Sequence, residues 1–176
     1  MDGTPERPRF GERPRDELQA IVPDFDAEAT GVVFNLIRAA NRIVQDLETT
    51  VHRPAGLSWA GFRILYTIDA MGPTEPRQLA RFSGVTRASI SSVLNTLERD
   101  GLITRTRAAT DKRAITVSLT ERGRQMVRQA IRRQNERERA WVTCLDHAER
   151  VALAELLRRL IGHHPGGDGA RREAPP

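Results

Sequence analysis

Apolar residues recur at intervals of three and four along most of the chain, and this spacing predicts a mainly helical protein. The first helix is expected to begin after Asp26, a residue type that caps helices by accepting a backbone N–H. Its apolar positions are Val33, Leu36, Ile37, Ala40, Ile43, Val44, Leu47 and Val51. The segment "HRPAG" ends this helix. A second helix follows the cap residue Ser58, reads "WAGFRILYTIDAM" and stops at Gly72 and Pro73.

Two shorter helices and a hairpin are predicted next. The segment "EPRQLARFSG" forms one helix, with Thr74 as its cap and Pro76 in its first turn, where a missing N–H costs nothing. Residues 86–100 form the other, which Thr86 caps and Gly101 ends. Beyond it "LITRTR" and "AITVSL" alternate between apolar and polar residues, which is typical of strands. The polar segment "AATDKR" between them predicts a β-hairpin with one apolar face, made by Ile115, Val117 and Leu119.

Two long helices complete the pattern. Thr120 is expected to cap a very polar helix, "ERGRQMVRQAIRRQNERERAWVTCL". The segment "DHAE", Asp146 to Glu149, has the spacing of a capping box. The apolar positions of the last helix are Val151, Leu153, Leu156, Leu157, Leu160 and Ile161. Residues 1–24 are expected to be a flexible extension and residues 164–176 a disordered tail, because proline and charged residues dominate both.

The helix 86–100 has two faces of different character. One is the stripe that must face the core, formed by Ile90, Val93, Leu94 and Leu97. The opposite face consists of Ala88, Ser92, Asn95 and Arg99, flanked by Ser89, Ser91 and Thr96. Helix starts usually favour acids because of the helix dipole, but the first two turns here carry none. Short side chains let the helix backbone come close to another surface, and missing acids remove repulsion if that surface is anionic.

These elements together predict a winged helix-turn-helix, a mainly α fold with a small β-hairpin wing. The major groove of DNA admits one helix and displays donors, acceptors and thymine methyl groups. The preceding helix and the tight turn at Gly84 give helix-turn-helix spacing, and the hairpin is then a wing whose tip can reach a minor groove or the backbone. The charge agrees with an anionic partner, since the chain of 176 residues has a net charge of +5 and residues 74–119 a net charge of +4.

The segment from Glu75 to Arg124 resembles the MarR family of bacterial transcriptional regulators. The motifs that carry the likeness are "LERDGLI", "DKR" at the wing tip and "LTERG" at the start of the long helix, and the likeness covers roughly residues 26–162. The resemblance implies a homodimer on a pseudo-palindromic DNA site. Residues 25–57 and 120–163 would then form a helical dimerisation region, and residues 58–119 the DNA-binding domain. It also implies that Arg113 enters the minor groove and that Asp111 braces the wing tip.

The DNA-contacting residues are expected on the helix 86–100 and on the wing 107–113. Arg87 and Asn95 are the best candidates for direct readout, because arginine clamps guanine and asparagine clamps adenine, with about 1–3 kcal/mol of discrimination each. Arg105, Arg107 and Lys112 are expected within range of phosphates. The full predicted set is Thr86, Arg87, Ala88, Ser89, Ser91, Ser92, Asn95, Arg105, Arg107, Asp111, Lys112 and Arg113.

A ligand site is implied on the helix that follows Ser58. Members of the family often bind small aromatic or phenolic ligands between the dimer region and the winged domains. The candidate residues that lie on this helix are Trp59, Phe62, Arg63 and Tyr66, although the glutamine common in the family is absent here, so the family's pocket chemistry does not carry over. Their helical spacing fits core packing as well, so both interpretations stay open. The leading hypothesis is therefore a homodimeric, sequence-specific DNA-binding regulator, a repressor released by a small ligand.

Other functions are less consistent with the sequence. We find no nucleophile motif, phosphate loop, paired acid/base site or metal-ligand spacing, so neither an enzyme nor a cofactor is expected. Cys144, the only cysteine, is expected to be a small core residue, with a redox-responsive regulator as the alternative. A winged protein-interaction module without DNA readout is another alternative. No run reaches the length of a membrane span and the N-terminus lacks a signal-peptide core, so a cytoplasmic protein without membrane contact is expected.

Overall fold

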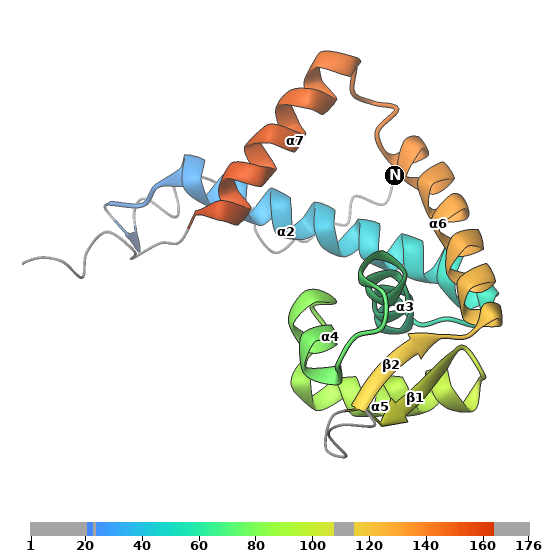
Figure 1. The fold of residues 1–176 in the computed structure, drawn as a ribbon. Coiled ribbons are helices and arrows are strands. Elements are labelled where there is room, and N and C mark those ends of the chain that lie inside the picture. Colours follow the sequence, from blue (N-terminus) through green and yellow to red (C-terminus); the bar gives the residue numbers. More distant parts are fainter. Residues whose placement is uncertain (1–20, 23, 108–114, 164–176) are drawn as a thin grey trace, which may run out of the picture. The chain divides into compact units, whose positions relative to one another are not determined.

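The computed structural model describes residues 21–22, 24–107 and 115–163 (Figure 1). This part of the chain is mainly helical with one two-stranded antiparallel hairpin, which confirms the predicted fold class. In chain order the elements are α2 (Ala27–Leu47), the π-helical turn η1 (Glu48–His52), the 3-10 turn η2 (Arg53–Ala55), α3 (Trp59–Met71), α4 (Pro76–Phe82), α5 (Arg87–Arg99), β1 (Ile103–Arg107), β2 (Ile115–Leu119), α6 (Glu121–Trp141) and α7 (His147–Gly162). They fall into two compact units, one ending at Ala130 and the other beginning at Ile131.

Five predicted helix caps are confirmed. Each cap side chain accepts the backbone N–H three residues further on, which satisfies a donor that a helix start leaves without a helical partner. The caps are Asp26 (2.9 Å from the nitrogen of Ala29), Ser58 (3.0 Å, Gly61), Thr86 (3.3 Å, Ser89), Thr120 (2.9 Å, Gly123) and Asp146 (2.9 Å, Glu149). The side chain of Glu149 accepts the backbone N–H of Asp146 at 2.8 Å, which completes the capping box.

The predicted cap of α4 is wrong. The N-cap position belongs to Glu75, whose side chain makes no capping hydrogen bond, while Pro76 occupies the first turn as predicted. Thr74 instead pairs with β2: its backbone N–H donates to the carbonyl of Val117 at 3.0 Å and its carbonyl accepts the N–H of Val117 at 2.9 Å. Its hydroxyl donates to the carbonyl of Gly72 at 2.6 Å. The connection from α3 to α4 is therefore fastened to the hairpin.

In the first unit, α3, α4 and α5 pack around one another and the hairpin lies against them (Figure 1). The most completely buried aliphatic side chains are Ile64, Leu65, Leu79, Leu94, Ile103, Val117 and Val127. The strands pair antiparallel, from Ile103 opposite Leu119 to Arg107 opposite Ile115. Leu119 is buried like Val117, as predicted, but Ile115 is exposed because it belongs to the last pair of the ladder.

After α2 the helical segment continues through η1 and η2 and ends at Gly56, where φ is +76°. The side chains of Leu47 and Val51, near its C-terminal end, are buried in the core. Further toward the N-terminus α2 has an apolar face that a single chain leaves exposed. The residues of this exposed α2 face are Val32, Val33, Leu36 and Ile37.

The second unit contains the C-terminal turns of α6 and the whole of α7. Nε of Arg150 donates to the carbonyls of Val142 (3.0 Å) and Leu145 (2.9 Å), which holds α7 to the turn before it. Most of the predicted apolar positions of α7 are exposed in the single chain: Val151, Leu153, Leu156, Leu160 and Ile161. Within the described ranges, no helix combines the length and apolar character that a bilayer crossing needs.

Candidate nucleic-acid interface

The helix α5 turns its predicted apolar stripe toward the core. Ile90, Leu94 and Leu97 are buried, and Val93 is half-buried. The other side of the helix is exposed along its whole length. The exposed residues there are Thr86, Arg87, Ala88, Ser89, Ser91, Ser92, Asn95, Thr96, Glu98 and Arg99. All the α5 residues that we predicted to contact DNA are therefore accessible to a partner.

Short hydroxyl side chains cover the exposed face of α5. The hydroxyl of Thr86 donates to Oγ of Ser89 at 2.9 Å, and that of Ser92 donates to the backbone carbonyl of Ser89 at 2.9 Å. The hydroxyl of Thr96 donates to the carbonyl of Ser92 at 3.2 Å. Because the hydroxyl hydrogens bond within the helix, these side chains lie close to its backbone and keep oxygen lone pairs free to accept. A partner surface can approach this face closely.

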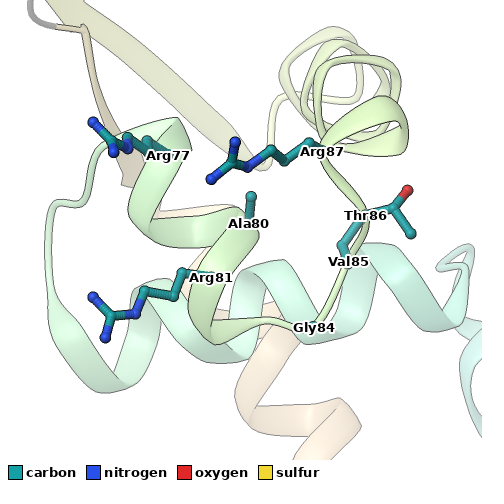
Figure 2. Close-up of a pocket in the computed structure, with 7 residues that line it drawn as sticks. All are labelled: Arg77, Ala80, Arg81, Gly84, Val85, Thr86 and Arg87. Atoms are coloured by element: carbon teal, nitrogen blue, oxygen red, sulfur yellow. The ribbon is translucent and has the colours of Figure 1, made fainter. Parts of the chain in front are cut away.

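A basic pocket of about 570 Å³ lies between α4 and the start of α5. Figure 2 shows Arg77 and Arg81 extending from α4 and Arg87 extending from the first turn of α5. Its other lining residues are Ala80, Gly84, Val85 and Thr86. None of the three arginines forms an ion pair with an acid in the described part of the chain. The pocket therefore presents positive charge that is available to an anion.

Arg77 and Arg81 were not among the predicted site residues. A signal was present in the sequence, since their spacing of four residues puts both on one side of a helix. No acidic residue occurs between Glu75 and Glu98, a stretch that includes α4 and most of α5. Only the fold, however, brings this side of α4 next to Arg87.

The wing contributes one described arginine side chain, Arg105 on β1. Its Nη2 donates to Oδ1 of Asn95 at 2.8 Å, and its Nε lies 3.6 Å from Oε2 of Glu98. The guanidinium is therefore directed onto α5. Arg107 is the last residue of β1. The predicted wing-tip residues lie in 108–114, outside the described residues: Asp111, Lys112 and Arg113.

The turn between α4 and α5 depends on Gly84. Its φ of +63° is in the left-handed region, which glycine adopts without steric cost. A Cβ at this position would also overlap the guanidinium of Arg63, which comes from α3. Arg63 in turn lies 6.0 Å from the ring centroid of Trp59, within the range of a cation–π contact. The side chain of Arg63 thus connects Trp59 on α3 with the helix-turn-helix turn.

Comparison with known proteins gives the family. The model of the MarR family matches residues 57–115. The uncharacterized HTH-type transcriptional regulator YwaE of Bacillus subtilis is 31% identical over 142 residues, which cover 81% of this chain and 83% of that protein. The chain belongs to the MarR family. It is a transcriptional regulator of the winged helix-turn-helix class and not an enzyme.

Solved structures of MarR-type regulators share this fold. BpsR of Bordetella bronchiseptica, whose DNA binding is regulated by 6-hydroxynicotinic acid, is 25% identical with a TM-score of 0.68, and the match covers 74% of this chain and 98% of that one. The MarR family regulator Sco3205 of Streptomyces coelicolor was solved in complex with DNA. It is 24% identical with a TM-score of 0.71, over 81% of this chain and 91% of that one, which shows the shared fold.

The predicted ligand residues of this MarR-family chain belong to an aromatic cluster. Phe62 is buried, Trp59 is half-buried and Tyr66 is exposed. The buried ring of His52 stacks on Phe62 with 4.3 Å between ring centroids and lies 5.2 Å from Trp59, while Phe62 and Tyr66 are 5.9 Å apart. His52 was not among the predicted site residues, because it comes from η1 and no local pattern relates it to α3. The cluster fits core packing, and ligand binding stays a prediction.

The single cysteine is not in the core. Cys144 is exposed in the turn between α6 and α7, so the expectation of a small core residue is wrong. Its thiol lies 3.8 Å from the carbonyl of Trp141, three residues earlier, because the segment after α6 forms turns that keep its side chains near the surface. In the described ranges, no group of three or more His, Cys, Asp or Glu side chains is placed to hold a metal ion.

Proposed function

We propose that this MarR-family regulator binds duplex DNA as a homodimer and reads a pseudo-palindromic operator, with α5 in the major groove and the wing 107–113 at the minor groove. The observation that carries the proposal is the exposed face of α5, which has no acidic residue in its first turns and is covered by short polar side chains. Its Arg87 shares a pocket with Arg77 and Arg81 of α4, and none of the three arginines has an acidic partner among the described residues. We further propose that it acts in the cytoplasm as a repressor that a small aromatic or phenolic ligand releases.

The reading face of α5 has the shape and the chemistry that the major groove requires. Ala88 offers a methyl group for contact with thymine, and Arg87 offers donors that match guanine. The serine hydroxyls at 89, 91 and 92 are suited to bases, phosphates or bridging waters. Thr86, as N-cap, belongs to a helix start whose dipole and free N–H groups favour an anion.

Phosphate contacts are proposed for the basic pocket and the wing. Arg77 and Arg81 extend from α4 beside the start of α5, where the DNA backbone would run if α5 lies in the groove. Each phosphate neutralised by an arginine releases condensed counterions, which favours binding. The contacts proposed for the wing are those of Arg107, Lys112 and Arg113, with Asp111 bracing the tip.

The homodimer proposal is supported by the two apolar faces that a single chain exposes, on α2 and on α7. Leu156 and Ile161 of α7 are 52% and 79% exposed, and Val33 and Ile37 of α2 are both 52% exposed. Several large apolar side chains exposed on one helix are typical of an interaction site. Residues 25–57 and 120–163 would form the dimerisation region, and residues 58–119 the DNA-binding domain.

Release by a ligand is proposed to act through the aromatic cluster. In BpsR a small aromatic acid regulates DNA binding. Here Arg63 contacts Trp59 on one side and reaches Gly84 in the helix-turn-helix turn on the other. A ligand that binds beside Trp59, Phe62 and Tyr66 and prefers one separation of the two α5 helices would shift the population away from the DNA-binding spacing.

Selection of bound sequences from a random duplex library tests this function. With the full chain at near-physiological salt, we expect an enriched palindrome with half-sites about 10–10.5 base pairs apart. Arg87→Ala should lose enrichment at particular base pairs, whereas Arg128→Ala, which removes an exposed charge from α6, should keep it. Binding that is weak, unaffected by salt and without a preferred sequence would instead indicate a protein-interaction module.

A further inference from the structure

A hydrogen-bonded pair connects the wing to the reading face of α5. The side chain of Arg105 is only 27% exposed, although it is charged and belongs to a hairpin of only two strands. Its Nη2 donates to Oδ1 of Asn95 at 2.8 Å, and its Nε is 3.6 Å from the carboxylate of Glu98. Asn95 and Glu98 are one helical turn apart, so both hold the guanidinium along the side of α5.

This contact selects one orientation of the Asn95 amide. An asparagine side chain has an acceptor oxygen and a donor nitrogen, which exchange places when the amide rotates by a half turn. A guanidinium has donors only, so it stabilises the orientation with oxygen toward Arg105 through a charge-assisted hydrogen bond. The flipped orientation loses that bond and sets two donors against each other. Asn95 is nevertheless exposed, so its amide remains accessible to DNA.

The orientation of the amide determines which bases it can pair with. In the major groove, adenine and cytosine present an amino donor where guanine and thymine present a carbonyl acceptor. An asparagine amide that is free to flip can offer its oxygen to adenine or cytosine and its nitrogen to guanine or thymine. An amide held in one orientation pairs well with only one of these two groups of bases. A fixed side chain also loses less conformational freedom when DNA binds.

We propose that Arg105 is a positioning residue that fixes the amide of Asn95, so that one base pair in each half-site is read with a single hydrogen-bond polarity. The proposal rests on the proposed function, in which α5 reads the major groove. It assigns Arg105 a role other than the phosphate contact that the sequence suggested. Specificity at this base pair then depends on a wing residue that need not touch DNA itself.

The first test compares library selections for the wild type, Arg105→Met and Arg107→Met. Methionine keeps an unbranched apolar stem and removes the donors, and both variants remove one charge from β1. In Arg105→Met the preference at one base pair of each half-site should fall at least about fivefold, with the other positions unchanged. Arg107→Met should weaken binding to all sequences and keep every preference. Equal preference profiles for the two variants would overturn the proposal.

Asn95→Asp supplies the complementary change. Its carboxylate still accepts from Arg105 but has no donor to offer to a base. The preference at the same base pair should therefore move toward adenine or cytosine, which present amino donors. A change at a different base pair, or at none, would show that the Asn95 amide does not read that position.

The second test needs no DNA and separates this proposal from the proposed function. Nitrogen-15 relaxation of the Asn95 side-chain amide reports its order in the free protein. The amide should be ordered in the wild type and in Arg107→Met, and mobile in Arg105→Met. Equal order in all three proteins would overturn the positioning role even if the library selects an operator. If the Asn95 amide loses its order in Arg105→Met but the library selection with the wild type enriches no sequence, the proposed DNA-reading function is overturned instead.

Discussion

Replacing Gly123 by alanine tests how the wing is joined to α6. Gly123 is buried in the first turn of α6, and a Cβ there would overlap the carbonyl oxygen of Leu102 and lie 2.9 Å from its carbonyl carbon. Both atoms belong to backbone, so a rotamer change cannot relieve the overlap. Either α6 or the start of β1 has to move.

The structure also indicates what that movement costs. The carbonyl of Leu102 accepts the N–H of Thr120 at 3.1 Å, and the carbonyl of Gly101 accepts the hydroxyl of Thr120 at 2.7 Å. Weakening these two hydrogen bonds costs about 1–3 kcal/mol together, and overpacking adds about 1–3 kcal/mol. The higher helix propensity of alanine offsets about 1 kcal/mol. The net loss in the free energy of unfolding is expected to be about 3 kcal/mol.

Urea unfolding followed by far-ultraviolet circular dichroism measures this change, at one protein concentration because the proposed dimerisation would affect the apparent stability. The midpoint should fall with an unchanged slope. Gly162→Ala is the matched control, because a Cβ at Gly162 meets no atom of the described residues within 4 Å and its effect should stay within about 1 kcal/mol. If Gly123→Ala is as stable as Gly162→Ala, the close approach of α6 to Leu102 does not exist in solution.

Three further predictions address DNA binding, assembly and pH. Replacing both Arg77 and Arg81 by glutamine should make the decline of log affinity with log salt shallower by about 0.9 per lost phosphate contact, measured by fluorescence anisotropy. Leu156→Asp should dissociate the proposed dimer in analytical ultracentrifugation, because it puts a carboxylate among the exposed apolar side chains of α7. The hydrogen bonds that Arg124 and, second, Gln125 donate to the Glu121 carboxylate lower its pKa. The stability that this carboxylate contributes to the fold is therefore fully present above the usual glutamate pKa. It is lost as the pH falls through the lowered pKa. A carboxyl NMR titration of Glu121 should give a pKa below the ordinary glutamate value.

Each of these predictions has a contrary outcome. An unchanged salt slope would show that the basic pocket does not contact phosphate. Arg158→Ala is the control, because it changes the same helix without adding a charge to the apolar side chains. If Arg158→Ala dissociates the protein as strongly as Leu156→Asp does, the apolar side chains of α7 are not the dimer contact. An ordinary pKa for Glu121 would mean that the hydrogen bonds from Arg124 and Gln125 are absent in solution.

Much of the fold was predictable because its determinants are local. A cap such as Ser58 acts on an N–H three residues away, and a stripe such as Ile90, Leu94 and Leu97 is defined by the period of one helix. The prediction for Thr74 was wrong, because this residue has a cap's residue type but pairs with Val117 from the hairpin. The backbone N–H and carbonyl of Thr74 both form hydrogen bonds with Val117, which lies on a strand far away in the sequence.

For the candidate site, the sequence by itself determined which side chains α5 exposes, because helical periodicity assigns each residue to a face. Tertiary structure decided what those side chains meet. Arg105 contacts Asn95 across ten residues, Arg77 and Arg81 share a pocket with Arg87, and Arg63 reaches Gly84 from another helix. No local pattern encodes these pairs, because contacts between separate elements depend on how the elements pack, and the packing is settled by the whole core at once.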